Sequence, residues 1–474
     1  MRSDRRATAA LILLCAAVFL DSMDLSLMGV ALPAIGADLA LPDSTLQWLM
    51  SGYAVAYGGF LLLGGRLADL LGRRRMFLAS LAVFAAASLA GGLLSDGWPL
   101  VATRVVKGVA AALTAPAALS LITTTFAEGP RRNRALGVYA LAGATGYSAG
   151  LIASGLLTEV SWRLVFFLPV PIALLVLAVA PRVIPAGRTT GPRTGFDTAG
   201  AGAVTGGVLL LVYSLTETNW PAGAAALVLL GAFVVIERRR RDPLVPLGVF
   251  RSRRLTSANL AALAWACATI GWQFAAVLYL QGVLGYSALD TGLGIVPMGL
   301  AIVVTANLAG RLIGRWSLRR TATLGLLVQG AGILLFLRTG ASSGYATVLL
   351  PALIVHGVGN GLSFPSLNIA AVGALPDDRQ GLASGLVTSA VQIGAGIGVA
   401  VLAAVMAIPA SALDGYRAAF LTAGSFSLLG ALIACLGLGN RAEPAAGEPA
   451  ADEPAADEPA ADEPTTSAPT STRA

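Results

Sequence analysis

The most constraining feature of the sequence is a succession of long apolar segments separated by short loops that contain arginine. A helix needs about 20 mostly apolar residues to cross a bilayer. Fourteen segments meet this requirement, at residues 7–35, 45–71, 76–94, 98–126, 136–157, 162–180, 198–215, 221–236, 255–284, 290–313, 321–337, 345–372, 380–406 and 415–438. With 56% hydrophobic and 12% charged residues, against about 25% charged in soluble proteins, the chain cannot cover itself with polar surface. We therefore predict an all-α polytopic membrane protein.

The distribution of arginine predicts the orientation of these segments. Basic residues favour cytoplasmic loops. With fourteen segments, nearly all arginines fall on one side, and the loops of the other side hold Arg163, Arg338 and Arg417. Both termini are therefore predicted to be cytoplasmic. The first segment could be a signal peptide, but it continues past its apolar core to Ile35, which favours an uncleaved helix.

Composition excludes several classes of partner. The 32 basic residues exceed the 25 acidic ones, but they lie in loops rather than in a nucleic-acid-binding patch. Cys15, Cys267 and Cys435 lie within apolar segments and suggest neither a disulfide framework nor a metal site. No cofactor is predicted. The arginine-, alanine- and glycine-rich usage suggests a bacterial source, and so a bacterial plasma membrane. Residues 440–474 are acidic and rich in proline and alanine, which predicts a disordered cytoplasmic tail.

The loop after the second segment carries an ordered combination of glycine, acid and base. Its members are Gly65, Asp69, Gly72, Arg73 and Arg74. Glycine permits close approach of helix ends at a tight turn, and an acid can pair there with arginine or a helix N-terminus. The arginines place this loop at the cytoplasmic headgroups.

This loop resembles the signature of the major facilitator superfamily, and further stretches resemble its fourteen-helix drug:proton antiporter branch. These are Asp24–Pro33 in the first segment, Leu100–Gly108 in the fourth, and Arg379–Gly385 in the thirteenth. The resemblance implies that the loop is a cytoplasmic gate motif. It also implies two pseudo-symmetric six-helix bundles that expose a central site alternately to each side. The implied division is residues 1–182 for the first bundle, 183–250 for a linker with two additional helices, 251–439 for the second bundle, and 440–474 for the tail.

The fifth segment departs from the family pattern. Gly146, Gly150 and Gly155 keep a face of small residues that permits close helix packing. Leu151 stands where the family's antiporter motif has proline, which leaves symport or uniport open beside antiport.

Ionisable groups inside a bilayer are costly and usually line a cavity or pair with one another. Asp21 and Asp24 are three residues apart in the first segment, as are Arg104 and Lys107 in the fourth, and together they form a neutral set. We assign proton coupling to Asp24, Asp21 and Arg104, with Lys107, the only lysine, compensating Asp21. Predicted residues of the substrate cavity are Lys107, Gln273, His356 and Asn360.

These patterns favour a monomeric, proton-coupled transporter that exports small amphipathic molecules such as drugs or antibiotics. A facilitator or symporter of a metabolite on the same fold is the first alternative. A non-transporting membrane sensor or scaffold, with the tail recruiting a partner, is a more distant one. No nucleophile–base pair or metal constellation suggests an enzyme.

Overall fold

The computed structural model describes residues 2–126, 130–184, 197–217, 219–240, 243, 245–376, 379–409 and 411–439. The predicted tail and the linker residues 185–196 lie outside them. Every regular element in the described residues is helical. The longer helices are α1 (Arg2–Leu39), α2 (Asp43–Leu71), α3 (Arg73–Leu93), α4 (Gly97–Thr125), α5 (Pro130–Val160), α6 (Arg163–Phe167) followed by α7 (Pro169–Val183), α8 (Thr198–Thr216), α9 (Trp220–Arg239), α10 (Arg253–Gly282), α11 (Ala288–Trp316), α12 (Leu318–Leu335), α13 (Leu350–Val372), α14 (Gln380–Met406) and α15 (Ala412–Gly437).

A helix occupies each of the fourteen predicted segments, so the prediction of an all-α chain is confirmed. The sixth segment is divided between α6 and α7, and the twelfth begins with a π-helical turn, Tyr345–Leu349, that leads into α13. Twelve helices in the described part of the chain are long and apolar enough to cross a membrane. The apolar helix at Ala199–Leu215 is shorter, and α2 falls outside the twelve. The count of fourteen spans therefore stays a prediction.

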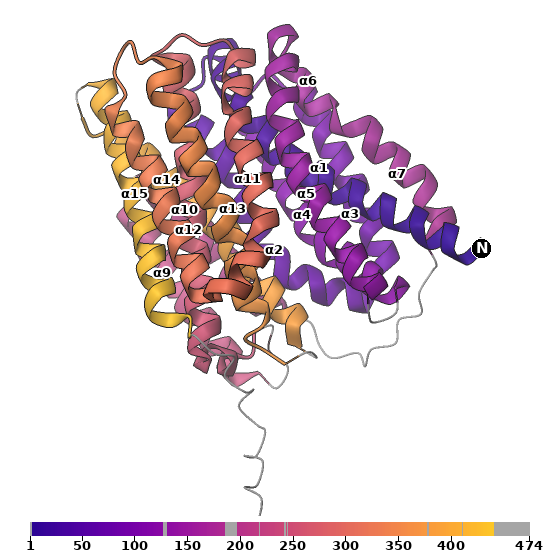
Figure 1. Ribbon diagram of the computed structural model, residues 1–474. Helices are drawn as coiled ribbons and strands as arrows, with labels where there is room; N and C mark the ends of the chain where they lie inside the picture. Colours follow the sequence, from indigo (N-terminus) through magenta and orange to yellow (C-terminus); the bar gives the residue numbers. More distant parts are fainter. Residues whose placement is uncertain are drawn as a thin grey trace, which may run out of the picture.

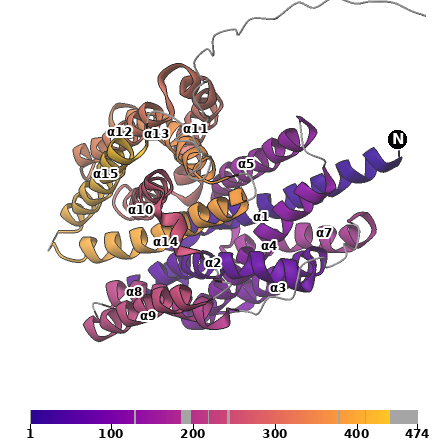
Figure 2. The same cartoon turned by 90° about the horizontal axis from the view of Figure 1, so that it is seen from below.

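The helices pack in two groups (Figures 1 and 2). Helices α1–α7 pack mainly with one another and form what we call the N-terminal bundle, while α10–α15 form the C-terminal bundle. The bundles meet where α2 packs on α14 and α5 packs on α11. Helix α8 lies against both α2 and α14, and α9 packs on α8 (Figure 2).

Two glycines bring α5 onto the backbone of α1. A Cβ atom at Gly146 would lie 2.4 Å from the carbonyl oxygen of Phe19, and one at Gly150 would lie 2.6 Å from that of Met23. Both distances are too short for any side chain. Two glycines of the predicted small-residue face of α5 therefore hold α1 and α5 together within the N-terminal bundle.

The C-terminal bundle repeats this contact between α14 and α10. A Cβ atom at Gly394 would lie 2.4 Å from the carbonyl oxygen of Leu263, and one at Gly398 would lie 2.5 Å from that of Cys267. The spacing of four residues is the same in both bundles. The repeat is the pseudo-symmetry expected of two related halves.

A turn with an unusual backbone also occurs in both bundles. Gly72, between α2 and α3, has φ 94°, and Ser317, between α11 and α12, has φ 107°. Glycine adopts positive φ at little cost, whereas serine there is strained. The face of the molecule that holds these two turns also holds Arg73, Arg74 and Arg315, and we call it the arginine-rich face.

The glycine contacts lead to a stability prediction. Gly146→Ala on α5 and Gly398→Ala on α14 each force a methyl group against a carbonyl, so we expect a loss of about 1–3 kcal/mol. This loss should appear as a lower midpoint of thermal unfolding of the purified protein. Gly137→Ala and Gly381→Ala are matched controls on the same helices, because a Cβ atom at either site meets nothing within 4 Å. Equal midpoints for all four variants would contradict the packing role.

Candidate functional site

A buried cluster of charges joins α1 to α4 in the N-terminal bundle. Asp24 is 2% exposed, and Arg104 and Lys107 are fully enclosed. Arg104 Nη1 donates to one carboxylate oxygen of Asp24, and Lys107 Nζ donates to the other. The salt bridge expected between Asp24 and Arg104 is therefore present. Lys107 is also bound to Asp24 rather than to Asp21, which corrects the pairing predicted from the sequence.

Further contacts hold the two cations in place. Arg104 Nε donates to the carbonyl oxygen of Leu49 at 2.9 Å, and its guanidinium carbon lies 4.7 Å from the ring centroid of Tyr53. Lys107 Nζ donates to Ser88 Oγ at 2.9 Å. Arg104 Nη2 has no hydrogen-bond partner among the described atoms. The two cations thus depend on Asp24 for their neutralisation, because no other acid bonds to them in the described residues.

Asp21 lies one helical turn before Asp24 and has a different environment. The hydroxyl group of Tyr53 donates to its carboxylate. No ion pair joins Asp21 to any described residue. Because Tyr53 also lies under Arg104, it connects the two acidic positions. No feature of the sequence marks Tyr53 as functional, since a tyrosine in an apolar segment is ordinarily a packing residue.

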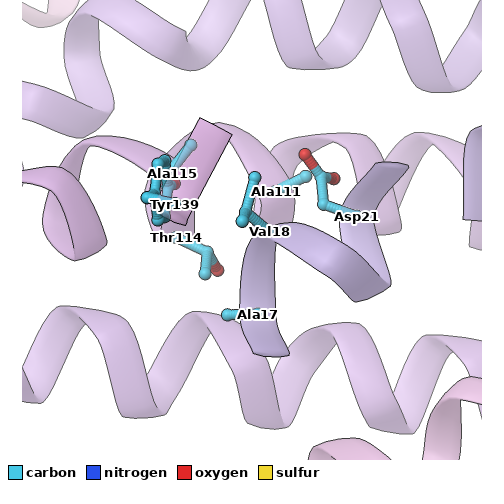
Figure 3. A pocket seen from close by; sticks show the side chains of 7 residues that line it. All are labelled: Ala17, Val18, Asp21, Ala111, Thr114, Ala115 and Tyr139. Carbon is cyan, nitrogen blue, oxygen red and sulfur yellow. The ribbon is translucent and has the colours of Figure 1, made fainter. Parts of the chain in front are cut away.

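Asp21 also lines a small cavity between α1, α4 and α5 of the N-terminal bundle (Figure 3). The lining residues are Ala17, Val18 and Asp21 of α1, Ala111, Thr114 and Ala115 of α4, and Tyr139 of α5. The cavity has about 10 Å³ of space for the centre of a water molecule, close to the minimum that one water needs. Asp21 is thus the acid of this group that a water molecule can reach, while Asp24 is enclosed by its cations.

The three predicted polar residues of the C-terminal bundle differ in their hydrogen bonding. Gln273 accepts a hydrogen bond from Tyr147 of α5 and so bridges the bundles. Asn360 Nδ2 lies 3.5 Å from Thr269 Oγ1. His356 is fully buried, and neither ring nitrogen has a partner among the described atoms. His356 and Lys107 are both fully buried in this conformation, and their predicted place in a substrate cavity stays a prediction.

The bundles touch at one end of α5 and α11. A Cβ atom at Gly155 would lie 2.9 Å from the carbonyl oxygen of Ala288, and one at Gly292 would lie 2.8 Å from that of Leu151. This crossing lies at the face opposite the arginine-rich one. Towards the arginine-rich face, a Cβ atom at Gly137 of α5 would meet nothing within 4 Å. Gly155 therefore serves the contact between bundles, whereas the other two predicted α5 glycines serve packing on α1.

The predicted gate motif lies at the turn between α2 and α3. Gly72 supplies the positive φ, and Arg74 Nη2 donates to the carbonyl oxygen of Pro181 at 2.6 Å, which ties α3 to the end of α7. The close helix approach falls one residue earlier than predicted. A Cβ atom at Gly64 would lie 2.3 Å from a backbone oxygen of α4, whereas one at Gly65 has its nearest neighbour at 3.9 Å. The side chain of Asp69 lies outside the described residues.

The charge cluster makes a prediction about coupled stability. Asp24→Asn leaves two enclosed cations without a counter-charge, and breaking a buried pair costs about 3–5 kcal/mol. Lys107→Met keeps the one-to-one pair of Asp24 with Arg104, so we expect a smaller loss. The double variant should be more stable than the sum of the two losses predicts, by about 0.5–3 kcal/mol. Thermal unfolding of the three variants measures this, and strictly additive losses would show that Lys107 and Asp24 do not interact.

Comparisons with known proteins agree with this architecture. The model of the Major Facilitator Superfamily matches residues 14–399 and, in a second match, residues 298–470. The fold is similar to a human organic anion transporter, with a TM-score of 0.63 and 17% identity over 92% of this chain and 100% of that chain. It is also similar to a POT family transporter in complex with 5-aminolevulinic acid, with a TM-score of 0.67 and 17% identity over 90% of this chain and 96% of that chain.

Curated relatives are more similar in sequence. The chain is 37% identical to a puromycin resistance protein of Streptomyces alboniger over 471 residues, which cover 93% of both proteins. It is 38% identical to a cephamycin export protein of Amycolatopsis lactamdurans over 447 residues, or 89% of this chain and 90% of that protein. The structural neighbours are transporters, not enzymes. The family predicted from the signature motifs is therefore confirmed, and this multi-pass membrane protein belongs to the Major Facilitator Superfamily.

Proposed function

We propose that the chain exports small amphipathic molecules, including antibiotics, in exchange for protons. Its relatives are named for resistance to puromycin and for export of cephamycin, which supports export rather than uptake. The observation that carries proton coupling is the pair of unlike acids on α1. One acid is neutralised by two cations, and the other is bonded to a tyrosine beside a cavity.

We assign the exchanged proton to Asp21 and the anchoring charge to Asp24. A carboxylate with two bound cations strongly favours its charged form, whereas one without a cation can gain and lose a proton at lower cost. Arg104 contacts both Asp24 and the ring of Tyr53, which in turn bonds to Asp21. A change in the α1–α4 contact can therefore alter proton binding at Asp21, as coupling requires.

The proposed transport cycle is a rocking of the two bundles about a central site. We assign fourteen spans, with bundles at residues 1–182 and 251–439 and two extra helices within 183–250. Both termini and the arginine-rich face lie in the cytoplasm, and the membrane is the bacterial plasma membrane. On this assignment the α5–α11 crossing at Gly155 closes the extracellular side. The Gly72 turn and Asp69 form the cytoplasmic gate, and the protein acts as a monomer.

A facilitator or symporter of a metabolite is the second candidate. Two observations favour it: the set of Asp21, Asp24, Arg104 and Lys107 carries no net charge when all four are ionised, and Leu151 replaces the motif proline. Counterflow of substrate without dependence on a proton gradient would support this candidate.

Asp21→Asn tests the proton assignment. We expect gradient-driven transport of a fluorescent dye into everted membrane vesicles, which corresponds to efflux from the cell, to fall at least about tenfold, because the asparagine cannot carry a proton. Dye counterflow without a gradient should persist, since the substituted side chain still bonds to Tyr53.

Asp38→Asn is the matched control on the same helix. Asp38 lies at the other end of α1, half exposed, where it pairs with Arg163 at 3.0 Å. We expect efflux by this variant to equal that of the wild type. Full gradient-driven efflux by the Asp21 variant would show that Asp21 does not carry the proton.

A further inference from the structure

Where α10 and α13 pack together, three residues of α10 each contact one residue of α13, in a row along the two helices. The rings of Trp265 and Phe364 are stacked, with centroids 4.8 Å apart and an interplanar angle of 25°. One turn further along, the polar groups of Thr269 and Asn360 lie 3.5 Å apart. The third pair is Trp272 with His356, whose ring centroids are 4.4 Å apart.

Exposure rises along this row of pairs. Trp272 and His356 are fully buried, Asn360 is 6% exposed, and Trp265 is 8% exposed. Phe364 is 37% exposed, although it lies well inside the length of α13. The row is therefore closed at one end and open at the stacked aromatic pair.

Phe364, the exposed member of this pair, lies between α10 and α11, and α1 of the N-terminal bundle contacts both of these helices. Gly357 and Gly361 of α13 turn towards α11, because Cβ atoms there would lie 2.5 Å from backbone oxygens of α11. Asn360 turns towards α10. With 3.6 residues per turn, Phe364 lies between these two faces of α13. Since α10 and α11 make few contacts with each other, the ring of Phe364 opens between them, on the inner side of the bundle.

The internal repeat relates Trp265 to the proton site. Phe19 of α1 and Leu263 of α10 occupy equivalent places in the α1–α5 and α10–α14 contacts. Asp21 and Trp265 each follow two residues later, so they are equivalent positions of the repeat. Asp21 lines the cavity between α1, α4 and α5 of the N-terminal bundle. Its counterpart in the C-terminal bundle is thus an indole ring.

The repeat relates Phe364 to the same cavity. Lys107-Gly108 of α4 and His356-Gly357 of α13 are equivalent positions of the repeat. Ala115 and Phe364 each lie eight residues after Lys107 and His356, so they are equivalent as well. Both glycines pack on a neighbouring backbone, since Cβ atoms there would lie 2.3 Å from the Tyr53 oxygen and 2.5 Å from the Met298 oxygen. Ala115 lines the cavity beside Asp21. The N-terminal bundle therefore has a small residue and an acid at these positions, and the C-terminal bundle has two stacked aromatic rings at the corresponding positions.

We propose that Trp265 and Phe364 form a stacking platform for a planar aromatic group of the transported molecule. This inference rests on the proposed export function and adds the chemical class of its substrate. Phe364 is the exposed member of the pair, at 37%, and its ring is held by stacking on Trp265, so it offers a fixed apolar surface to a further ring. Trp265 is the buried member of the pair and supports the ring of Phe364 from behind.

The test is binding to the purified full-length protein in lipid nanodiscs. Ethidium serves as a planar aromatic probe, and tetrapropylammonium as a probe of the same charge without a ring. Phe364→Leu keeps an apolar side chain but removes the ring, so we expect ethidium to bind about three- to tenfold more weakly. Tetrapropylammonium should bind as it does to the wild type. Phe364→Tyr keeps the ring and should retain ethidium binding.

Phe250→Leu is the matched control, because Phe250 is 38% exposed and lies outside both bundles' inner walls, in the turn before α10. Equal ethidium affinity for the wild type and Phe364→Leu, or equal weakening of both probes, would overturn the platform. Thermal unfolding separates a folding defect from a binding defect. If the wild type exports compounds but does not bind ethidium, the platform is wrong and export stands. If it neither exports nor binds any compound, the proposed function is wrong, and the platform with it.

Discussion

The ion pairs of Asp24 with Arg104 and Lys107 are the interaction on which the N-terminal bundle most depends. Three charged groups with almost no exposure can be held inside a membrane only if each neutralises or bonds to another. This requirement fixes α1 against α4 at one height, because Arg104 and Lys107, a turn apart on α4, must reach the same carboxylate. It also leaves Asp21 without a bound cation among the described residues, with Tyr53 as its hydrogen-bond donor.

The C-terminal bundle repeats the backbone contacts of the N-terminal bundle, but the three pairs of described residues at its α10–α13 crossing carry no ion pair. Glycine contacts at Gly394 and Gly398 reproduce those at Gly146 and Gly150, so the backbone framework is common to both halves. The side chains at the crossing of the inner helices differ completely. Where Lys107 forms an ion pair, its counterpart His356 stacks on Trp272. Close backbone packing thus fixes the common framework. The few large or polar residues where α1 meets α4, and where α10 meets α13, determine the chemistry of each bundle.

The sequence predicted the helices well because length, apolar character and loop arginines are local properties. It also located Asp24 and Arg104, since ionisable residues are rare in apolar segments. It did not predict which cation pairs with which acid, because that depends on helix rotation and depth, which no local pattern records. It also missed Tyr53 and the Trp265–Phe364 pair, whose partners lie far along the chain and whose residue types are common in any apolar core. It did not predict the close approach of Gly64 to α4 either, because the sequence does not say which residue of a helix lies nearest its neighbour.

The proposed proton site lies in the N-terminal bundle and the proposed stacking platform in the C-terminal bundle, and this separation has a mechanical consequence. In the conformation described, the bundles are joined by the Gly155–Gly292 crossing at one face, and α5 is open near Gly137 towards the other. A ligand that lies between the platform and the cavity of Asp21 contacts both bundles at once, so its binding energy depends on their separation. A proton on Asp21 acts on one bundle alone, through Tyr53 and the charge cluster. If the substrate and the proton each favour a different arrangement of the two bundles, the binding of one changes the affinity for the other. This linkage needs no direct contact between the two sites.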